Sequence, residues 1–112
     1  MRTVLIALTL VALAMPANAQ AIFLNVPPNA TCEWIIANQE TTPDAMIFAG
    51  GTYFHGEHMG KPCVKVDYIR AYELTQRSGN AQALKTMIRL IKKRAENGSN
   101  RAQKAVKQLG LD

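Results

Sequence analysis

Apolar side chains recur along the second half of the chain with the spacing of one helical face. From residue 81 to residue 97 they fall three or four positions apart, and this period predicts the longest helix of the protein. Asn80 is placed to cap its first turn, and Gly98-Ser99-Asn100 breaks the chain after it. The apolar face of this helix consists of Leu84, Met87, Ile88, Ile91 and Ala95.

Two helices are predicted before residue 55. Thr31 can cap about two helical turns over residues 32–39. The sequence Thr42-Pro43-Asp44 combines a capping hydroxyl, a proline at the first helical position and an acid in the first turn. A second helix is therefore expected to run from there to about Phe54.

Two more helices are predicted after the centre of the chain. Asp67 is placed to cap residues 68–78, and Gly79 can end that helix in a left-handed conformation. A final helix follows the break at residues 98–100 and ends at Gly110. Since no convincing strand pattern appears, the prediction is an all-α fold of about five helices. The apolar stripe of the final helix consists of Ala102, Ala105, Val106 and Leu109.

The helix predicted before Phe54 is rich in small residues. Ala45, Ala49 and Gly50 lie on adjacent faces and are too small to hold a neighbouring helix at the usual distance. Glycine inside a helix costs about 1 kcal/mol relative to alanine. The presence of Gly50 and Gly51 therefore predicts close backbone packing against another helix, with Tyr53 covering the end of the contact.

The first 19 residues have the pattern of an export signal. Arg2 precedes an apolar stretch over residues 4–15, and Ala17-Asn18-Ala19 forms a small-x-small cleavage site. The stretch is shorter than the roughly 20 residues that span a bilayer as a helix. The pattern predicts a bacterial periplasmic or secreted protein, with a retained membrane anchor as the alternative.

Cleavage after residue 19 leaves 93 of the 112 residues as one small domain. Loss of Arg2 reduces the 13 basic residues to 12, against 8 acids, so the mature chain has a net charge of +4. Residues 20–30 carry an apolar run and Pro27-Pro28, which predicts an extended strap on the helical body. A mobile arm for a partner is the alternative. Residues 31–112 are predicted to form the helical domain.

Cys32 and Cys63 are the only cysteines of the chain. In an exported protein two cysteines are expected to form a disulfide. A bridge that closes 31 positions of chain stabilises by roughly 3–4 kcal/mol, because it restricts the unfolded state. A free reactive thiol and a pair of metal-binding thiolates are the alternatives, and neither suits an oxidising compartment.

The small residues around Tyr53 follow a recurrent spacing. Ala45, Gly50, Tyr53 and Gly56 fit A-x-x-x-L-G-x-x-Y-x-x-G, with Ala49 at the leucine position, and after a loop Val64, Asp67, Ala71 and Leu74 fit G-V-x-x-D and the helix that follows it. This stretch resembles the Sel-one-like repeats, a branch of the tetratricopeptide-like helical hairpins. The resemblance covers about 40 of the 93 mature residues. It implies a right-handed stack of antiparallel helix pairs, of a kind commonly used as a protein-binding adaptor, and it implies no catalytic residues.

The chain departs from the repeat pattern in three places. Cys63 stands where glycine is usual, and the loop from Gly56 to Val64 is longer than usual. The helix that begins near Ala81 lacks the glycine-tyrosine-glycine set. The sequence therefore looks like one recognisable repeat with degenerate flanking helices. Because repeat arrays usually need about three units for stability, we expect the disulfide and the terminal helices to act as caps.

The longer loop contains the only histidines of the chain. His55 and His58 lie three positions apart near a helix end, and Glu57 or Met59 would complete a set of three ligands for copper or zinc. The alternative is a polar loop in which a histidine cation is favoured at a helix C-terminus. The glycines and the missing fourth ligand favour the polar loop, and no cofactor is predicted. A periplasmic copper- or zinc-binding protein stays as the alternative function.

The last third of the chain is basic. Residues 77–107 contain nine lysines and arginines and a single acid, Glu96. Such a surface is either a solvated helix face or a docking surface for an acidic protein, anionic lipid headgroups or envelope phosphates. Nucleic acid is not expected, because the chain is predicted to be exported and no aromatic residue follows Tyr72. The stripe opposite the apolar face consists of Lys85, Arg89, Lys92 and Lys93.

The residues offer little support for catalysis. The two serines lie at predicted helix boundaries, both histidines share one loop, and no two acids have the spacing of a general acid/base pair. The protein is therefore predicted not to be an enzyme. The function predicted from the sequence is that of a small exported protein-interaction module of the bacterial envelope, with a protein partner; the basic surface would suit an acidic one.

Overall fold

The computed structural model describes residues 25–112, and this part of the chain is helical apart from one small hairpin. The predicted all-α class, with about five helices and one disulfide, is confirmed there. The predicted signal sequence, residues 1–19, and residues 20–24 of the predicted strap lie outside the described residues. The helices are α2 (Cys32–Ala37), α3 (Pro43–His55), α4 (Tyr68–Arg77), α5 (Ala81–Glu96) and α6 (Asn100–Leu109).

Each helix begins where its sequence supplies a capping side chain. In every case a side-chain oxygen accepts a hydrogen bond from the backbone N–H three residues later, which satisfies one of the free donors of the first turn. The predicted helix starts are therefore confirmed to within one or two residues. The capping residues are Thr31, Thr42, Asp67, Asn80 and Ser99.

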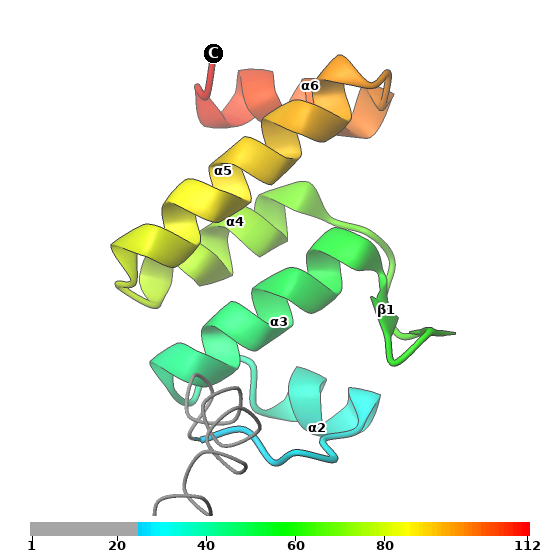
Figure 1. Cartoon of the computed structure of the whole chain (residues 1–112), viewed down its shortest axis with the longest axis vertical. Helices are drawn as coiled ribbons and strands as arrows, with labels where there is room; N and C mark the ends of the chain where they lie inside the picture. Colours follow the sequence, from blue (N-terminus) through cyan, green and yellow to red (C-terminus); the bar gives the residue numbers. More distant parts are fainter. Residues whose placement is uncertain (1–24) are drawn as a thin grey trace, which may run out of the picture.

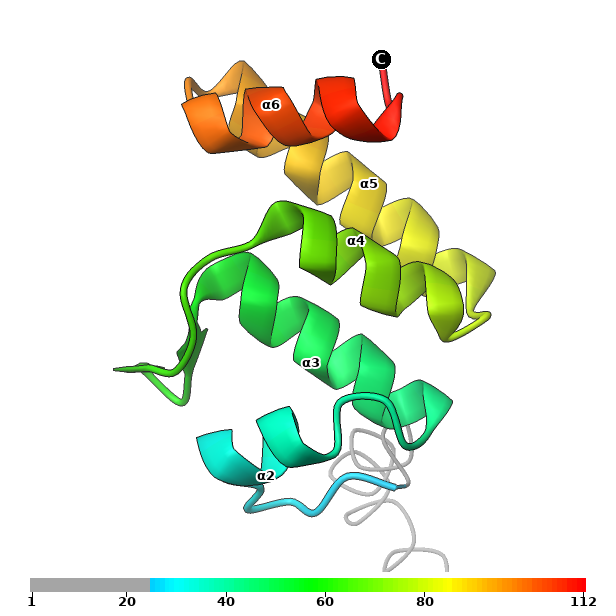
Figure 2. The same cartoon turned by 180° about the vertical axis from the view of Figure 1, so that it is seen from behind.

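The helices form a stack in which neighbours in sequence are neighbours in space. α3 and α4 run antiparallel, α5 lies on the other side of α4, and α6 covers α5 and one end of α4 (Figures 1 and 2). Two apolar clusters fill the stack. One joins α2, α3 and α4 around Ile35 and Leu74, and the other joins α3 to α6 around Phe54 and Ile91. No helix within residues 25–112 has the length and apolar character needed to span a membrane.

The contact between α3 and α4 is close at the predicted small residues. Ala45, Ala49 and Gly50 are all buried. A Cβ atom built on Gly50 would lie 2.7 Å from Thr75 Oγ1 and 3.2 Å from the backbone oxygen of Ala71. Thr75 Oγ1 donates to that same oxygen at 2.7 Å, so it has little freedom to move away. The prediction of backbone packing is confirmed at Gly50.

The same prediction is wrong for Gly51. Among the described residues, none beyond its own turn of helix comes within 4 Å of the position that its Cβ would occupy, and Gly51 is only half-buried. Successive residues of a helix point about 100° apart, so Gly51 faces away from α4. Its lack of a side chain is therefore not explained by packing within this part of the protein.

The disulfide between Cys32 and Cys63 is present, as predicted, and its Cα atoms lie 5.7 Å apart. It joins the first turn of α2 to the segment that enters α4. Charged side chains fasten the turn that follows α2, because Arg70 and Arg77 of α4 both pair with Glu40 in this turn, at 2.8 and 2.7 Å. α2 is thereby held at two points beside the α3–α4 pair.

The prediction that the chain contains no strand is wrong for the segment between α3 and α4. β1 (Glu57–His58) and β2 (Lys61–Pro62) form an antiparallel pair, with His58 opposite Lys61. Met59 and Gly60 connect them with positive φ angles of 54° and 78°, which is the backbone sign pattern of a tight hairpin turn. Two-residue strands are too short to show an alternating pattern in the sequence.

The predicted strap is only partly extended. Val26 is buried against the helices, as expected, but the N–H of Ala30 donates to the carbonyl of Pro27 at 3.1 Å and closes a turn. Proline at the second position of such a turn, here Pro28, is favourable because its φ is already fixed. The strap therefore bends as it approaches α2.

Candidate functional site

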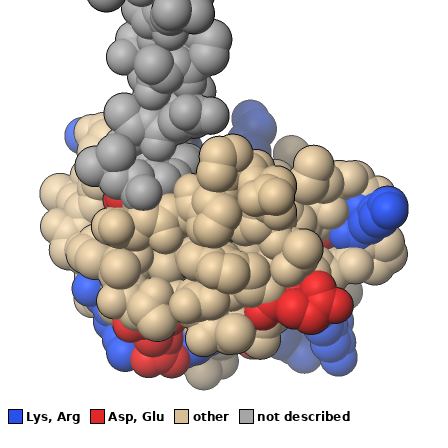
Figure 3. All heavy atoms as spheres, turned by 90° about the horizontal axis from the view of Figure 1, so that it is seen from below, with Lys and Arg blue, Asp and Glu red and all other residues tan. Residues whose placement is uncertain are grey.

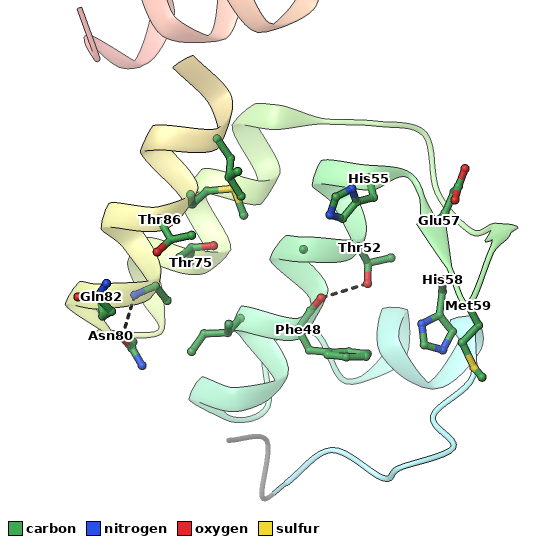
Figure 4. Close-up of a pocket in the computed structure, with 15 residues that line it drawn as sticks. Phe48, Thr52, His55, Glu57, His58, Met59, Thr75, Asn80, Gln82 and Thr86 are labelled. Carbon is green, nitrogen blue, oxygen red and sulfur yellow. Dashed lines mark hydrogen bonds between the residues drawn. The ribbon is translucent and has the colours of Figure 1, made fainter. Parts of the chain in front are cut away.

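A groove of about 760 Å³ opens on the exposed side of α3. α3 forms its floor, α5 forms one wall, and the β1–β2 hairpin forms the other wall (Figure 4). The floor residues recur at helical spacing, so they form one continuous face of α3. They are Ile47, Phe48, Gly51, Thr52 and His55.

This face of α3 is apolar because the whole of α3 is rich in apolar residues. Between Asp44 and His55 the helix carries no charged side chain. Only one side of such a helix can pack on α4, so its opposite side presents uncharged surface to the outside. Gly51 lies in the middle of this face, where its missing side chain deepens the groove. The hydroxyl of Thr52 is occupied internally, since it donates to the carbonyl of Phe48 at 3.1 Å.

The α5 wall mixes apolar and polar side chains. Ala83 and Met87 are its apolar residues in the first half of α5, and Met87 is buried. Gln82 and Thr86 belong to the same wall, and no other described residue forms a hydrogen bond with their side chains. Both side chains are therefore available to hydrogen-bond with a bound molecule.

The hairpin wall ends in an exposed apolar side chain. Met59 is 76% exposed and is the single large hydrophobic side chain that is exposed within residues 25–112. It also has a left-handed backbone conformation, with φ at 54°, which is uncommon for a residue other than glycine. Exposure and a left-handed backbone both act against stability, and both occur in Met59 at the edge of the groove.

The hairpin is held firmly in place. His58 Nε2 lies 2.6 Å from the carbonyl oxygen of Ala30, and the His58 ring contacts Phe48 edge-on, with 5.7 Å between ring centroids. On the other strand, the N–H of Cys63 donates to the carbonyl of Gly56 at 3.0 Å. The disulfide at Cys63 adds a covalent attachment to α2.

The structure does not bring the predicted metal ligands to one point. His55, His58 and Met59 all line the groove, but Figure 4 shows the two imidazoles on different sides of Thr52, with Met59 pointing outwards. The His58 ring already contacts Ala30 and Phe48. Within residues 25–112 no group of three histidine, cysteine, aspartate or glutamate side chains could hold a metal ion. The metal alternative gains no support from this part of the chain.

The predicted basic stripe borders the groove. Lys85, Arg89, Lys92 and Lys93 are all exposed, and none forms an ion pair within the described part of the chain. Other basic residues of this region have internal roles. The guanidinium of Arg94 lies 4.6 Å from the centroid of the Phe54 ring and donates to Tyr68 at 3.2 Å, and Arg101 donates to the carbonyl of Val66.

The surface at the α2 end has a different character. Figure 3 shows that the middle of this face carries no charged side chains, and that acidic and basic residues gather at its margins. The four cations of α5 are therefore not part of a uniformly basic surface.

The groove itself was not predicted from the sequence. Gly51 was assigned to internal packing, and Thr75, Gln82 and Thr86 were not singled out. Two signals point to it in retrospect: α3 has more apolar surface than one neighbour can cover, and Ala83, Met87 and Leu90 widen the apolar face of α5 beyond its contact with α4.

Comparisons of the chain with protein-family models, with curated proteins and with solved structures find no match. The resemblance to Sel-one-like repeats therefore stays a prediction from the residues quoted for it.

Proposed function

We propose that this protein is a small exported interaction module of the bacterial envelope, which binds another protein in the groove over α3. The groove is the observation that carries the proposal: an uncharged floor lies open between two walls that are fixed in position. Recognition sites in proteins combine such apolar surface with a few placed polar groups. Here the polar groups are Gln82 and Thr86.

The rigidity of the site supports a binding role. α3 is packed on α4 through Gly50, the hairpin is attached to α2 by the disulfide, and the cap of α5 fixes the start of the second wall. A preformed site binds more tightly than a flexible one, because less conformational entropy is lost on binding. The disulfide also suits the oxidising compartment that the export signal predicts.

The resemblance to Sel-one-like repeats supports the same proposal, since such helix pairs commonly serve as adaptors. Nothing in the described residues calls for a bound cofactor, and the proposed partner is a protein.

Photo-crosslinking in intact cells tests the proposal. A photoreactive amino acid is introduced at Thr86 in the groove and, in a separate strain, at Lys107 on the exposed side of α6. We expect a discrete crosslinked product of higher mass from position 86 and none from position 107. Equal labelling at both positions, or no product at either, would contradict the proposal. A product with twice the mass of the mature chain would instead indicate a second copy as the occupant.

A further inference from the structure

The walls of the groove differ in charge. The hairpin wall carries one acidic side chain, Glu57, beside the apolar Met59. On the α5 side, Gln82, Thr86 and Leu90 line the groove at i, i+4 and i+8. Lys85, Arg89 and Lys93 each follow one of these by three positions and so form the adjacent row on the helix. Three cations therefore edge the α5 wall, and Lys92 lies one row further from the groove.

The floor lacks a side chain at its centre. Gly51 costs about 1 kcal/mol relative to alanine in a helix, and no internal contact requires it. Glycine is used where the backbone must come close to a ligand. The same position filled by any side chain would lift a bound molecule away from Ile47, Phe48 and Thr52.

From these observations we propose that the groove takes an extended segment of the partner protein that crosses α3, with an apolar side chain at one end and acidic side chains at the other. This inference rests on the proposed function and specifies the chemistry of its partner. The apolar end lies against Met59 and Phe48, and the acidic end lies beside Arg89 and Lys93. Gly51 admits the backbone of the segment, and Gln82 and Thr86 hydrogen-bond with it.

The arrangement of charge fixes the direction of the segment. If the acidic end of the segment lay at the hairpin, it would face the carboxylate of Glu57. If it lies at α5, it faces three cations that form no ion pair with any described residue. Repulsion between like charges across an interface disfavours binding in the wrong register. The net charge of the mature chain, +4, also favours an acidic partner.

Selection from a library of random nine-residue peptides tests the proposal. The oxidised mature chain, residues 20–112, is immobilised, and the enriched peptides are sequenced and their affinities measured by fluorescence anisotropy. We expect enriched peptides to combine apolar residues at one end with aspartate or glutamate at the other. Enrichment of neutral or basic sequences, or no enrichment, would overturn the inference.

Three variants locate the binding. Gly51→Leu fills the floor and should weaken binding by roughly tenfold or more, since a buried apolar contact of this size is worth about 1.5–3 kcal/mol. Met59→Asn removes the apolar anchor but keeps a residue that tolerates the left-handed conformation, so the fold is retained and binding falls. Lys93→Gln should weaken binding by roughly 1.5-fold to fivefold, the range of a favourable surface charge.

Lys92→Gln is the matched control for Lys93→Gln. The two lysines are adjacent in sequence and both exposed, so the variants have the same net charge. Only Lys93 belongs to the row beside the groove. Equal weakening by both variants would show general attraction by net charge and would overturn the proposed placement. Crosslinking at position 86 together with a library that enriches no acidic peptide would leave the proposed function standing and reject this inference alone.

Discussion

Gly50 lies against the backbone of α4, where an added Cβ would meet Thr75 Oγ1 at 2.7 Å. Gly51 lies about 100° further round the same helix, and a Cβ added there would meet no described residue beyond its own turn of helix within 4 Å. Both glycines weaken α3 by a similar amount. At Gly50 the close approach of two helices compensates. At Gly51 no contact within the described protein compensates for the weaker helix, and the residue lies in the floor of an open groove. One helix thus presents a closed face, which builds the fold, and an open face, where we propose that a partner binds.

The comparison shows that a small residue in a helix can allow close packing at one position and leave an open surface at the next. The closed face follows from contacts that can be measured within the chain, and its residues can be tested by stability alone. The open face has to be tested by binding, because changes there are expected to leave stability unchanged or to improve it. The predictions below separate the two.

The largest effect is expected from the disulfide, which holds α2 and the hairpin beside the closed face. Replacement of both Cys32 and Cys63 by alanine should lower the free energy of unfolding by about 3–4 kcal/mol, because the unfolded chain gains freedom over 31 positions. Urea denaturation followed by circular dichroism measures this difference. Reductant should destabilise the wild type and leave the double variant unchanged. A wild type indifferent to reductant would show that the bond does not contribute.

Gly50→Ala should give the next largest loss. Forcing an extra methyl group into a packed contact costs about 1–3 kcal/mol, and the gain of about 1 kcal/mol in helix propensity offsets part of it. Because Thr75 Oγ1 is held by its own hydrogen bond, the cost should lie in the upper part of this range, about 2–3 kcal/mol. The net destabilisation is then about 1–2 kcal/mol, which lowers the melting temperature of a domain of this size by about 4–16 °C. An unchanged melting temperature would mean that α3 and α4 do not approach closely at this point.

A second substitution sharpens this result. Thr75→Ala removes the hydroxyl that the new methyl group would meet, although the Ala71 carbonyl at 3.2 Å stays in place. The penalty of Gly50→Ala should therefore be smaller in a Thr75→Ala background than in the wild type. Contacting residues show such non-additivity, whereas distant residues do not. Strict additivity would locate the strain elsewhere.

The closed face could be predicted from the sequence because it depends on local rules. Threonine, aspartate, asparagine and serine caps mark the helix starts, and the spacing of apolar residues marks the faces that pack. The burial of Ala45, Ala49 and Gly50 follows from their size. The pairing of Cys32 with Cys63 follows from their number and the predicted compartment.

The open face could not be predicted in the same way, because it is the side of α3 that does not pack against a neighbouring helix. Whether Gly51 meets another helix is decided by the position of α5, which no local pattern reveals. The hairpin was missed because its strands have two residues each, and the exposure of Met59 follows from that turn. The basic stripe of α5 could be predicted from the sequence. Its position one row from the groove could not, because that depends on how α5 is oriented.

Gly51→Ala is expected to stabilise the protein. The added methyl group enters open space, so only the gain in helix propensity and the smaller entropy of the unfolded chain remain, about 0.5–1 kcal/mol together. Thermal melting beside Gly50→Ala measures the contrast directly, because the two variants have identical composition. A loss of stability at position 51 would contradict the expectation that this face of α3 is open.

The smallest effect is expected at the edge of the closed face, where Glu40 joins α2 to α4. Hydrogen bonds from Arg70 and Arg77 lower the pKa of Glu40 below its usual value of 4.5. A carboxyl group whose pKa is lower in the folded state contributes stability above its unfolded pKa and loses that contribution as the pH falls through the folded pKa. Glu40→Gln should therefore lower the urea midpoint slightly at pH 7, and its difference from the wild type should be smaller near pH 3.

Glu96→Gln is the control for this experiment, since Glu96 forms no ion pair within the described part of the chain. Exposed ion pairs contribute little, so a small difference at neutral pH that shrinks in acid is the informative outcome. If Glu40→Gln differed from the wild type by the same amount at both pH values, the charge of Glu40 would not be responsible, and the contact between α2 and α4 would depend on apolar packing and the disulfide.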